Sequence, residues 1–88
     1  MLPLTGWTWQ ETVGHGWWNL VGAVPVDIPA TMGLEGGVWF AVRQGIHGLF
    51  VHDEQGRPVV FMLCEPASYY YQVMTRSARM PVLIGERI

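Results

Sequence analysis

The chain has 88 residues, of which 50% are apolar and only 14% are charged, and its formal net charge is −2. A chain of this length predicts a single domain, and so apolar a composition argues against intrinsic disorder. All five basic residues are arginines, so the sequence lacks the dense positive charge that nucleic-acid binding requires.

The surface is expected to be sparsely charged. Seven acidic and five basic residues spread over the roughly 5,200 Å² of a compact protein of this mass. Part of the apolar excess should therefore stay exposed or meet a partner. Cys64 is the single cysteine, which excludes an intramolecular disulfide, and no apolar run reaches the roughly 20 residues of a membrane span. We expect a cytoplasmic protein with no membrane contact.

Two strands are expected in the first 24 residues of the chain. In residues 6–14, Trp7 and Trp9 alternate with polar residues, which is the period of a half-buried strand. Residues 15–24 are a second strand candidate, because a run of apolar and aromatic residues ends there at a proline.

Trp17 and Trp18 are adjacent in the second strand candidate, where neighbouring side chains point to opposite faces. One of them is expected to pack in the core. The other is then an exposed anchor for a partner, because tryptophan is enriched at binding hot spots. The alternative is that the small core takes both rings.

Residues 25–37 contain two prolines and three glycines without clean periodicity, which predicts a long loop. Long loops in compact domains are often functional. In a competing hypothesis this loop is the mouth of a small-ligand site, with His15, Asp27 and Glu35 as its candidate residues.

The best-supported unit is a three-stranded meander over residues 38–64, with a tight turn at Gln44-Gly45 between its first two strands. Its last two strands form a hairpin. Asp53 opens the turn of this hairpin, and Gly56 takes the left-handed conformation that closes it.

Both faces of that hairpin are apolar, whereas a half-exposed strand should alternate apolar with polar residues. One face carries Leu49, Val51, Val59, Phe61 and Leu63, and the other carries Ile46, Phe50, Val60, Met62 and Cys64. Either the segment with the paired tryptophans wraps round to close a barrel, or a second subunit covers the second face. The apolar excess favours a second subunit.

Polar residues at helical spacing predict a helix over residues 66–79, although three consecutive tyrosines also suit a strand. The helical phase places Tyr70 in the core and leaves Tyr69 or Tyr71 partly exposed beside two arginines, a composition typical of interfaces. Residues 81–88 are expected to add a short final strand.

Catalytic and metal-binding patterns are not found in the sequence. His47 and His52 fall on opposite faces of one strand, and no histidine or cysteine spacing typical of zinc occurs. Neither serine lies in a nucleophile motif. Cys64 lies in an apolar strand, where a buried and inert thiol is expected. We therefore expect no metal site, no cofactor and no enzymatic activity.

Together these patterns predict an α+β fold, a small antiparallel sheet of about four to six strands with one C-terminal helix. A small all-β barrel is the alternative. The expected function is a non-catalytic protein–protein interaction module, a homodimer or a docking protein, of the kind that serves as a bacterial or phage accessory or inhibitor protein. The alternative is a small-ligand-binding protein or minor enzyme. The interface candidates are Trp17, Trp18, Tyr69, Tyr71, Arg76, Arg79, Phe50 and Met62.

Overall fold

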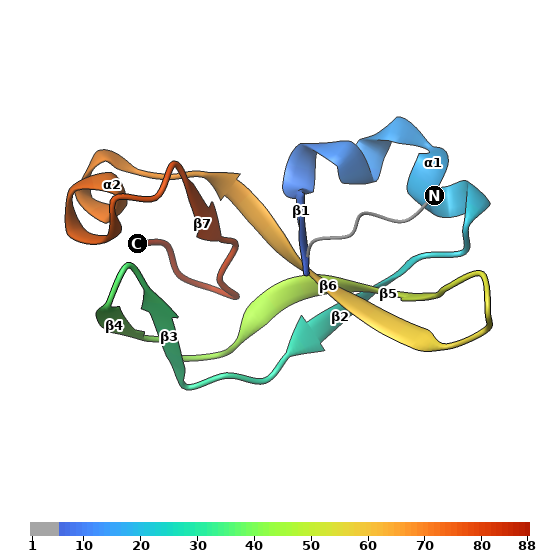
Figure 1. Ribbon diagram of the computed structural model, residues 1–88, viewed down its shortest axis with the longest axis horizontal. Helices are drawn as coiled ribbons and strands as arrows, with labels where there is room; N and C mark the ends of the chain where they lie inside the picture. Colours follow the sequence, from blue (N-terminus) through green and yellow to red (C-terminus); the bar gives the residue numbers. More distant parts are fainter. Residues whose placement is uncertain (1–5) are drawn as a thin grey trace.

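The computed structural model describes residues 6–88, apart from the side chain of His15. Seven strands in this part of the chain form two sheets (Figure 1). The larger sheet has the order β1 (Trp7–Trp9), β6 (Pro58–Pro66), β5 (Ile46–His52) and β2 (Val24–Ile28), and β7 (Arg79–Pro81) also pairs with β6. The smaller sheet is a hairpin of β3 (Met32–Glu35) and β4 (Val38–Ala41). The helical segments are η1 (Gln10–His15), α1 (Trp17–Leu20) and α2 (Tyr69–Thr75).

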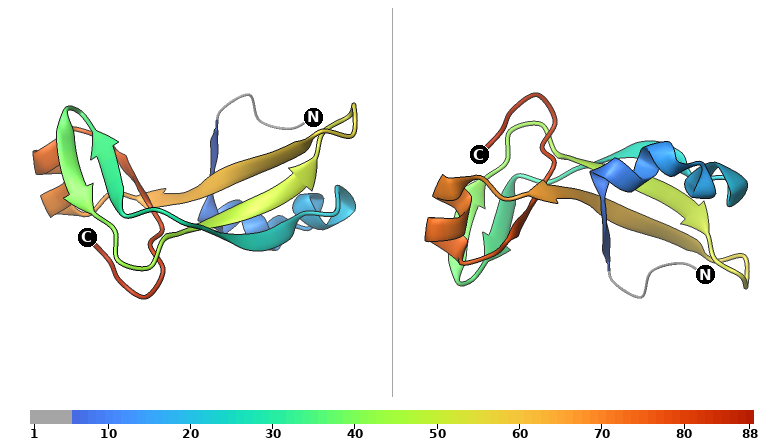
Figure 2. Two further views of the ribbon diagram at one scale, coloured as in Figure 1. Left: turned by 90° about the horizontal axis from the view of Figure 1, so that it is seen from below. Right: turned by 90° about the horizontal axis from the view of Figure 1, so that it is seen from above.

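This architecture confirms the α+β class with its C-terminal helix, and the described strands do not close into a barrel. The molecule is elongated, with extents of 37 × 22 × 22 Å. Strands β5 and β6 run along its length, with η1 and α1 towards one end (Figures 1 and 2). The opposite end holds α2, β7 and the β3–β4 hairpin.

The predicted hairpin between β5 and β6 is confirmed in its register, since His52 pairs with Pro58 across the turn. Gly56 has a φ of 79°, and its N–H donates to the carbonyl oxygen of Asp53 at 2.9 Å. The Asp53 carboxylate accepts hydrogen bonds from the backbone N–H groups of Arg57 and Gln55 and from the Arg57 guanidinium. These donors, the Arg57 N–H first among them, lower the pKa of Asp53.

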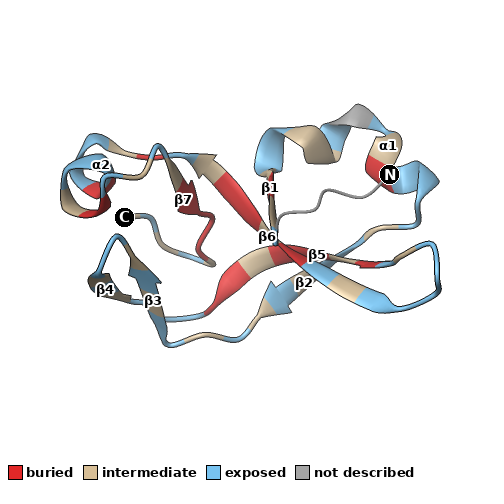
Figure 3. Cartoon of the chain, viewed as in Figure 1, coloured by how far each residue is buried: buried red, intermediate tan, exposed pale blue. Residues whose placement is uncertain are grey.

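The first face of this hairpin forms the main core, which η1 and α1 cover. Its buried members are Trp18, Leu49, Val51, Phe61, Leu63 and Val82. The second face is covered at one end only, where Ile46 packs with Val42 and Leu83. Figure 3 shows that buried residues gather along β5 and β6 at the centre of the molecule.

The strand predicted for residues 15–24 is wrong, because the chain forms the end of η1 and then α1 there. Gly16, with a φ of 71°, separates the two helical segments. Trp18 is buried against Phe61, and its Nε1–H donates to Thr12 Oγ1 at 2.9 Å. On a helix, adjacent rings need not point to opposite sides, and Trp17 packs edge-on against Trp18 at the same core.

The long loop predicted for residues 25–37 is also wrong, since β2 and β3 occupy most of it. Pro25 obscured β2 in the sequence, yet a proline is tolerated on a strand at the edge of a sheet, which is where β2 lies. The predicted meander over residues 38–64 is wrong in its first strand, because β4 pairs with β3 rather than with β5.

The predicted C-terminal helix is present but shorter, beginning after Ser68, whose Oγ accepts a hydrogen bond from the Tyr71 N–H. It ends at Arg76, which has a φ of 60°. The predicted core position is wrong by one residue, since Tyr70 is exposed and Tyr71 is 1% exposed. Burial raises the pKa of the Tyr71 phenol to about 12.

The first predicted strand is shorter than expected, since it is limited to β1 and the chain turns into η1 at residue 10. The strand predicted for residues 81–88 is wrong, because β7 ends at Pro81 and only a single bridge, from Leu83 to Ile46, lies beyond it. β7 begins instead at Arg79, the last residue of the range predicted as helix, because pairing with the end of β6 sets its conformation.

Candidate interaction surface

The β3–β4 hairpin owes its form to the two glycines at its tip. Gly36 and Gly37 have φ values of 56° and 78°, and they are the only residues between the paired ends Glu35 and Val38. Positive φ at both positions is the requirement of a type I′ turn, which matches the twist of two antiparallel strands.

The inner face of this hairpin packs on the C-terminal helix. The Phe40 ring lies edge-on to Tyr71, with 5.7 Å between ring centroids. It also covers Gly33, where a Cβ atom would overlap the ring. At the tip, a Cβ on Gly36 would overlap the carbonyl oxygen of Thr75 at the end of α2. These contacts hold the hairpin in one orientation.

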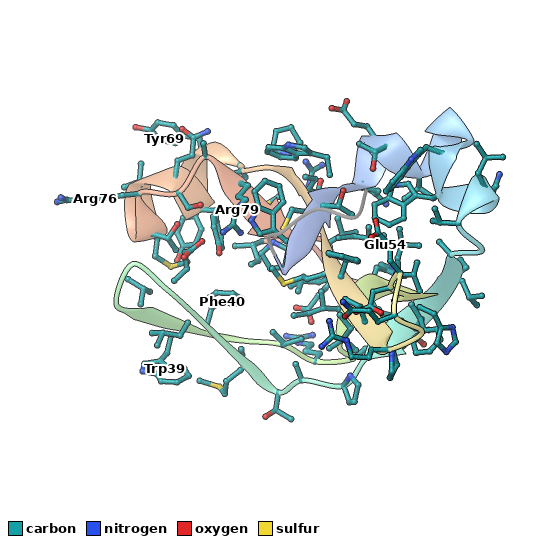
Figure 4. The ribbon with its side chains drawn as sticks, turned by 45° about the vertical axis from the view of Figure 1, so that its right-hand side comes forward. Trp39, Phe40, Glu54, Tyr69, Arg76 and Arg79 are labelled. Atoms are coloured by element: carbon teal, nitrogen blue, oxygen red, sulfur yellow. The ribbon has the colours of Figure 1, made fainter. Side chains whose placement is uncertain are left out.

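The outer face of the hairpin is apolar throughout. Because side chains alternate along a strand, Met32 and Leu34 of β3 share this face with Trp39 and Ala41 of β4. All four residues are exposed, and Trp39 is 63% exposed. Figure 4 shows Trp39 pointing away from the molecule, while Phe40 points towards α2. We call these four residues the hairpin outer face.

Charged groups lie on the inner side of the hairpin, around Arg79. Its Nη1 atom is 3.9 Å from the Glu35 carboxylate and 3.8 Å from Cys64 Sγ. Its guanidinium carbon also lies 4.4 Å from the centroid of the Trp7 ring. Burial raises the pKa of the Cys64 thiol, and Arg79 opposes this shift only in part.

The predicted interface residues are scattered over the molecule. Trp18 and Tyr71 are buried, so neither ring is available to a partner. Tyr69 is exposed on α2, and Arg76 is exposed directly after its last residue. The other four are half-buried on separate elements, namely Trp17, Phe50, Met62 and Arg79.

The residues of the ligand hypothesis do not converge. Asp27 lies on β2 opposite His47, whereas Glu35 lies in the other sheet and faces Arg79. The side chain of His15 falls outside the described part of the structure. A hollow of about 390 Å³ lies elsewhere, between the end of β6 and the segment where β1 leads into η1. Its lining residues are Trp9, Gln10, Glu11, Cys64, Glu65 and Pro66. Its Glu65 carboxylate is paired with Arg87 at 3.1 Å.

Two further findings concern the described residues only. No group of three histidine, cysteine or acidic side chains in residues 6–88 is close enough to hold a metal ion. None of the helices described for this chain has the length and apolarity needed to cross a membrane.

A second apolar surface lies on the large sheet, where Val24, Phe50 and Val60 are directly paired across three strands. Val24 and Val60 are exposed and Phe50 is half-buried. Phe50 stacks edge-on with His52 on the same face. Phe50 and Val60 are the uncovered part of the second hairpin face. The cluster around Ile46 covers the other end of that face.

The sequence interpretation missed the hairpin outer face, although the signal for it was present. Gly36-Gly37 is a dipeptide typical of two-residue hairpin turns. Counting outward from it, alternate residues on both sides are apolar, which includes Trp39. The prolines and glycines of residues 25–37 masked this pattern.

The chain matches no protein-family model, no curated protein and no solved structure.

Proposed function

We propose that this chain is a non-catalytic, cytoplasmic protein–protein interaction module that self-associates or docks on another protein. The observation that carries the proposal is the hairpin outer face, an uncharged apolar surface with an exposed tryptophan. Tryptophan is among the residues most enriched at binding hot spots, and contiguous exposed apolar patches on small proteins commonly mark binding sites.

The elongated shape of the molecule supports the same proposal. Its radius of gyration is 13.5 Å, against about 12 Å for a compact domain of this length. An elongated chain buries less of its own apolar surface than a compact one does, and a partner can cover part of what stays exposed.

The ligand hypothesis has weaker support, because Asp27 and Glu35 lie in different sheets. The carboxylates of Glu35 and Glu65 each lie within 4 Å of an arginine guanidinium.

The test is to compare the chain with Trp39→Ser and with Val73→Ser. Val73 lies on α2 and is 63% exposed, as Trp39 is, so it controls for loss of any exposed apolar side chain. We expect the unchanged chain to sediment above its monomer mass or to retain a specific protein from its source organism. Trp39→Ser should lose this association with an unchanged circular dichroism spectrum, and Val73→Ser should keep it. A chain that is monomeric at about 100 µM and retains no protein contradicts the proposal.

A further inference from the structure

We propose that the β3–β4 hairpin is a lid on the C-terminal helix, and that it opens as a unit while the large sheet stays folded. The structure shows the closed position, in which Phe40 packs on Tyr71. Opening uncovers the buried apolar cluster of Ala67, Tyr71 and Met80, because Phe40 is one of the side chains that cover it. This inference concerns the stability of one end of the molecule and does not rest on the proposed function.

The first support is that the hairpin is a sheet of its own. Strands β3 and β4 pair with each other and with no other described strand. In the described part of the chain, the backbone hydrogen bonds of turns and loops also include none from β3 or β4 to another element. A hairpin of two strands is at best marginally stable in water, so its side-chain contacts must keep it folded.

The second support is that the hairpin buries little of itself. Neither the four residues of β3 nor the four of β4 include a buried one. In β5, by contrast, four of the seven residues are buried. The free energy of opening a segment rises with the apolar surface that it buries, so the hairpin should open more readily than the central strands.

The third support is that few contacts hold the lid closed, and that the main core is separate from them. Phe40 supplies the aromatic contact, and the tip at Gly36 lies against the carbonyl oxygen of Thr75. Glu35 and Arg79 are 3.9 Å apart and both are partly exposed, so this ion pair adds little. All buried members of the main core lie outside the hairpin, and they stay packed when it opens.

The base of the hairpin is fixed to the large sheet. Val42 directly follows β4, and it is buried in one cluster with Ile46 and Leu83. Its N–H donates to the carbonyl oxygen of Thr31 at 2.9 Å, which joins the two connecting segments of the chain. The lid therefore turns just beyond Thr31 and Val42, and the hairpin with its tip at α2 is the part that moves (Figure 1).

The experiment is native-state hydrogen exchange on the full chain, followed residue by residue by NMR at urea concentrations below the unfolding transition. Once detached, the hairpin loses its strand pairing, so its amides exchange through opening of the lid. We expect their protection factors to lie at least about thirtyfold below those of the amides that pair β5 with β6. Their dependence on urea should be weaker, because opening exposes little surface. The Val42 amide should behave like the β5–β6 amides.

Core variants separate opening of the lid from unfolding of the sheet. Val51 is 1% exposed in the main core, which is intact whether the lid is closed or open. Val51→Ala should therefore lower the protection of the β5–β6 amides about tenfold or more and leave that of the hairpin amides unchanged. Val59→Ala, at the edge of the same core, is the milder variant if Val51→Ala does not fold. Phe40→Ala should lower the protection of both groups, because it destabilises only the closed state.

Two results overturn the inference. Hairpin amides that match the β5–β6 amides in protection and in urea dependence show that hairpin and sheet unfold together. An equal fall of protection in both groups with Val51→Ala, or with Val59→Ala in its place, shows the same. Neither result bears on association through Trp39, which sedimentation measures separately, so failure of the lid and failure of the proposed function are distinguishable.

Discussion

Substitution of Gly36 tests how firmly the β3–β4 hairpin is held to the rest of the molecule. Gly36 and Gly37 form one turn and both have positive φ. They differ in surroundings, since a Cβ on Gly36 would overlap the carbonyl oxygen of Thr75, whereas a Cβ on Gly37 meets no atom within 4 Å. The pair therefore separates the cost of backbone conformation from the cost of a lost tertiary contact.

The expected magnitudes follow from these two costs. A left-handed conformation costs an alanine about 1–2 kcal/mol, and this cost applies to Gly36→Ala and Gly37→Ala alike. Gly36→Ala must also move the tip away from α2, which weakens the edge-on contact of Phe40 with Tyr71. Such an aromatic pair contributes about 0.5–1.5 kcal/mol beyond its buried area. With the lost packing around it, we expect Gly36→Ala to cost about 2 kcal/mol more than Gly37→Ala.

The assay is urea and thermal unfolding of both variants at equal protein concentration, followed by circular dichroism. A difference of about 2 kcal/mol corresponds to roughly 8–16 °C in melting temperature for a domain of this size. Equal losses of stability in the two variants would refute the reasoning, because the tip would then make no contact with α2 that matters to folding.

The remaining predictions concern the central hairpin and the main core. Gly56→Val should lower the unfolding free energy by about 1–2 kcal/mol or more, because a β-branched residue resists the φ of 79°; an unchanged melting temperature contradicts this. Trp18→Ala should cost about 3–5 kcal/mol in urea unfolding because the ring is buried, and Trp17→Ala should cost less than half as much because Trp17 is half-buried; equal costs would count against the helical placement of the two rings. The pKa of Asp53 is lowered in the folded state, so its charge stabilises the fold above the unfolded-state pKa and this stabilisation disappears as the pH falls through the folded-state pKa. Asp53→Asn should therefore lower the melting temperature at pH 7 and by a smaller amount near pH 3, and a gap that widens in acid would contradict the sign.

Short-range patterns in the sequence were sufficient for the central hairpin. The turn at Asp53 and Gly56 sets the pairing of His52 with Pro58, and the two-residue period then assigns every side chain to a face. The presence of the C-terminal helix could also be predicted from its polar spacing. Its buried side could not, because a one-residue shift from Tyr70 to Tyr71 changes the local pattern little.

Other features depend on contacts between distant residues. β2 is a strand because it pairs with β5, whereas its own sequence, interrupted by Pro25, does not predict a strand. Trp17 and Trp18 adopt a helix because the Trp18 ring then packs on Phe61 and donates a hydrogen bond to Thr12 Oγ1. Intrinsic propensity favoured a strand for both tryptophans, and packing overrode a preference worth about 1 kcal/mol.

The sequence by itself determined the α+β class, the register of the central hairpin and the excess of apolar over charged side chains. Each of these depends on composition or on residues close together along the chain. Only the tertiary structure decided which apolar side chains stay outside. Phe40 and Trp39 are neighbours of similar hydrophobicity, yet Phe40 packs on Tyr71 and Trp39 is left on the surface. The reason is physical: a hairpin with two apolar faces buries the face that meets another element, and α2, about 30 residues further along the chain, is the element that selects it.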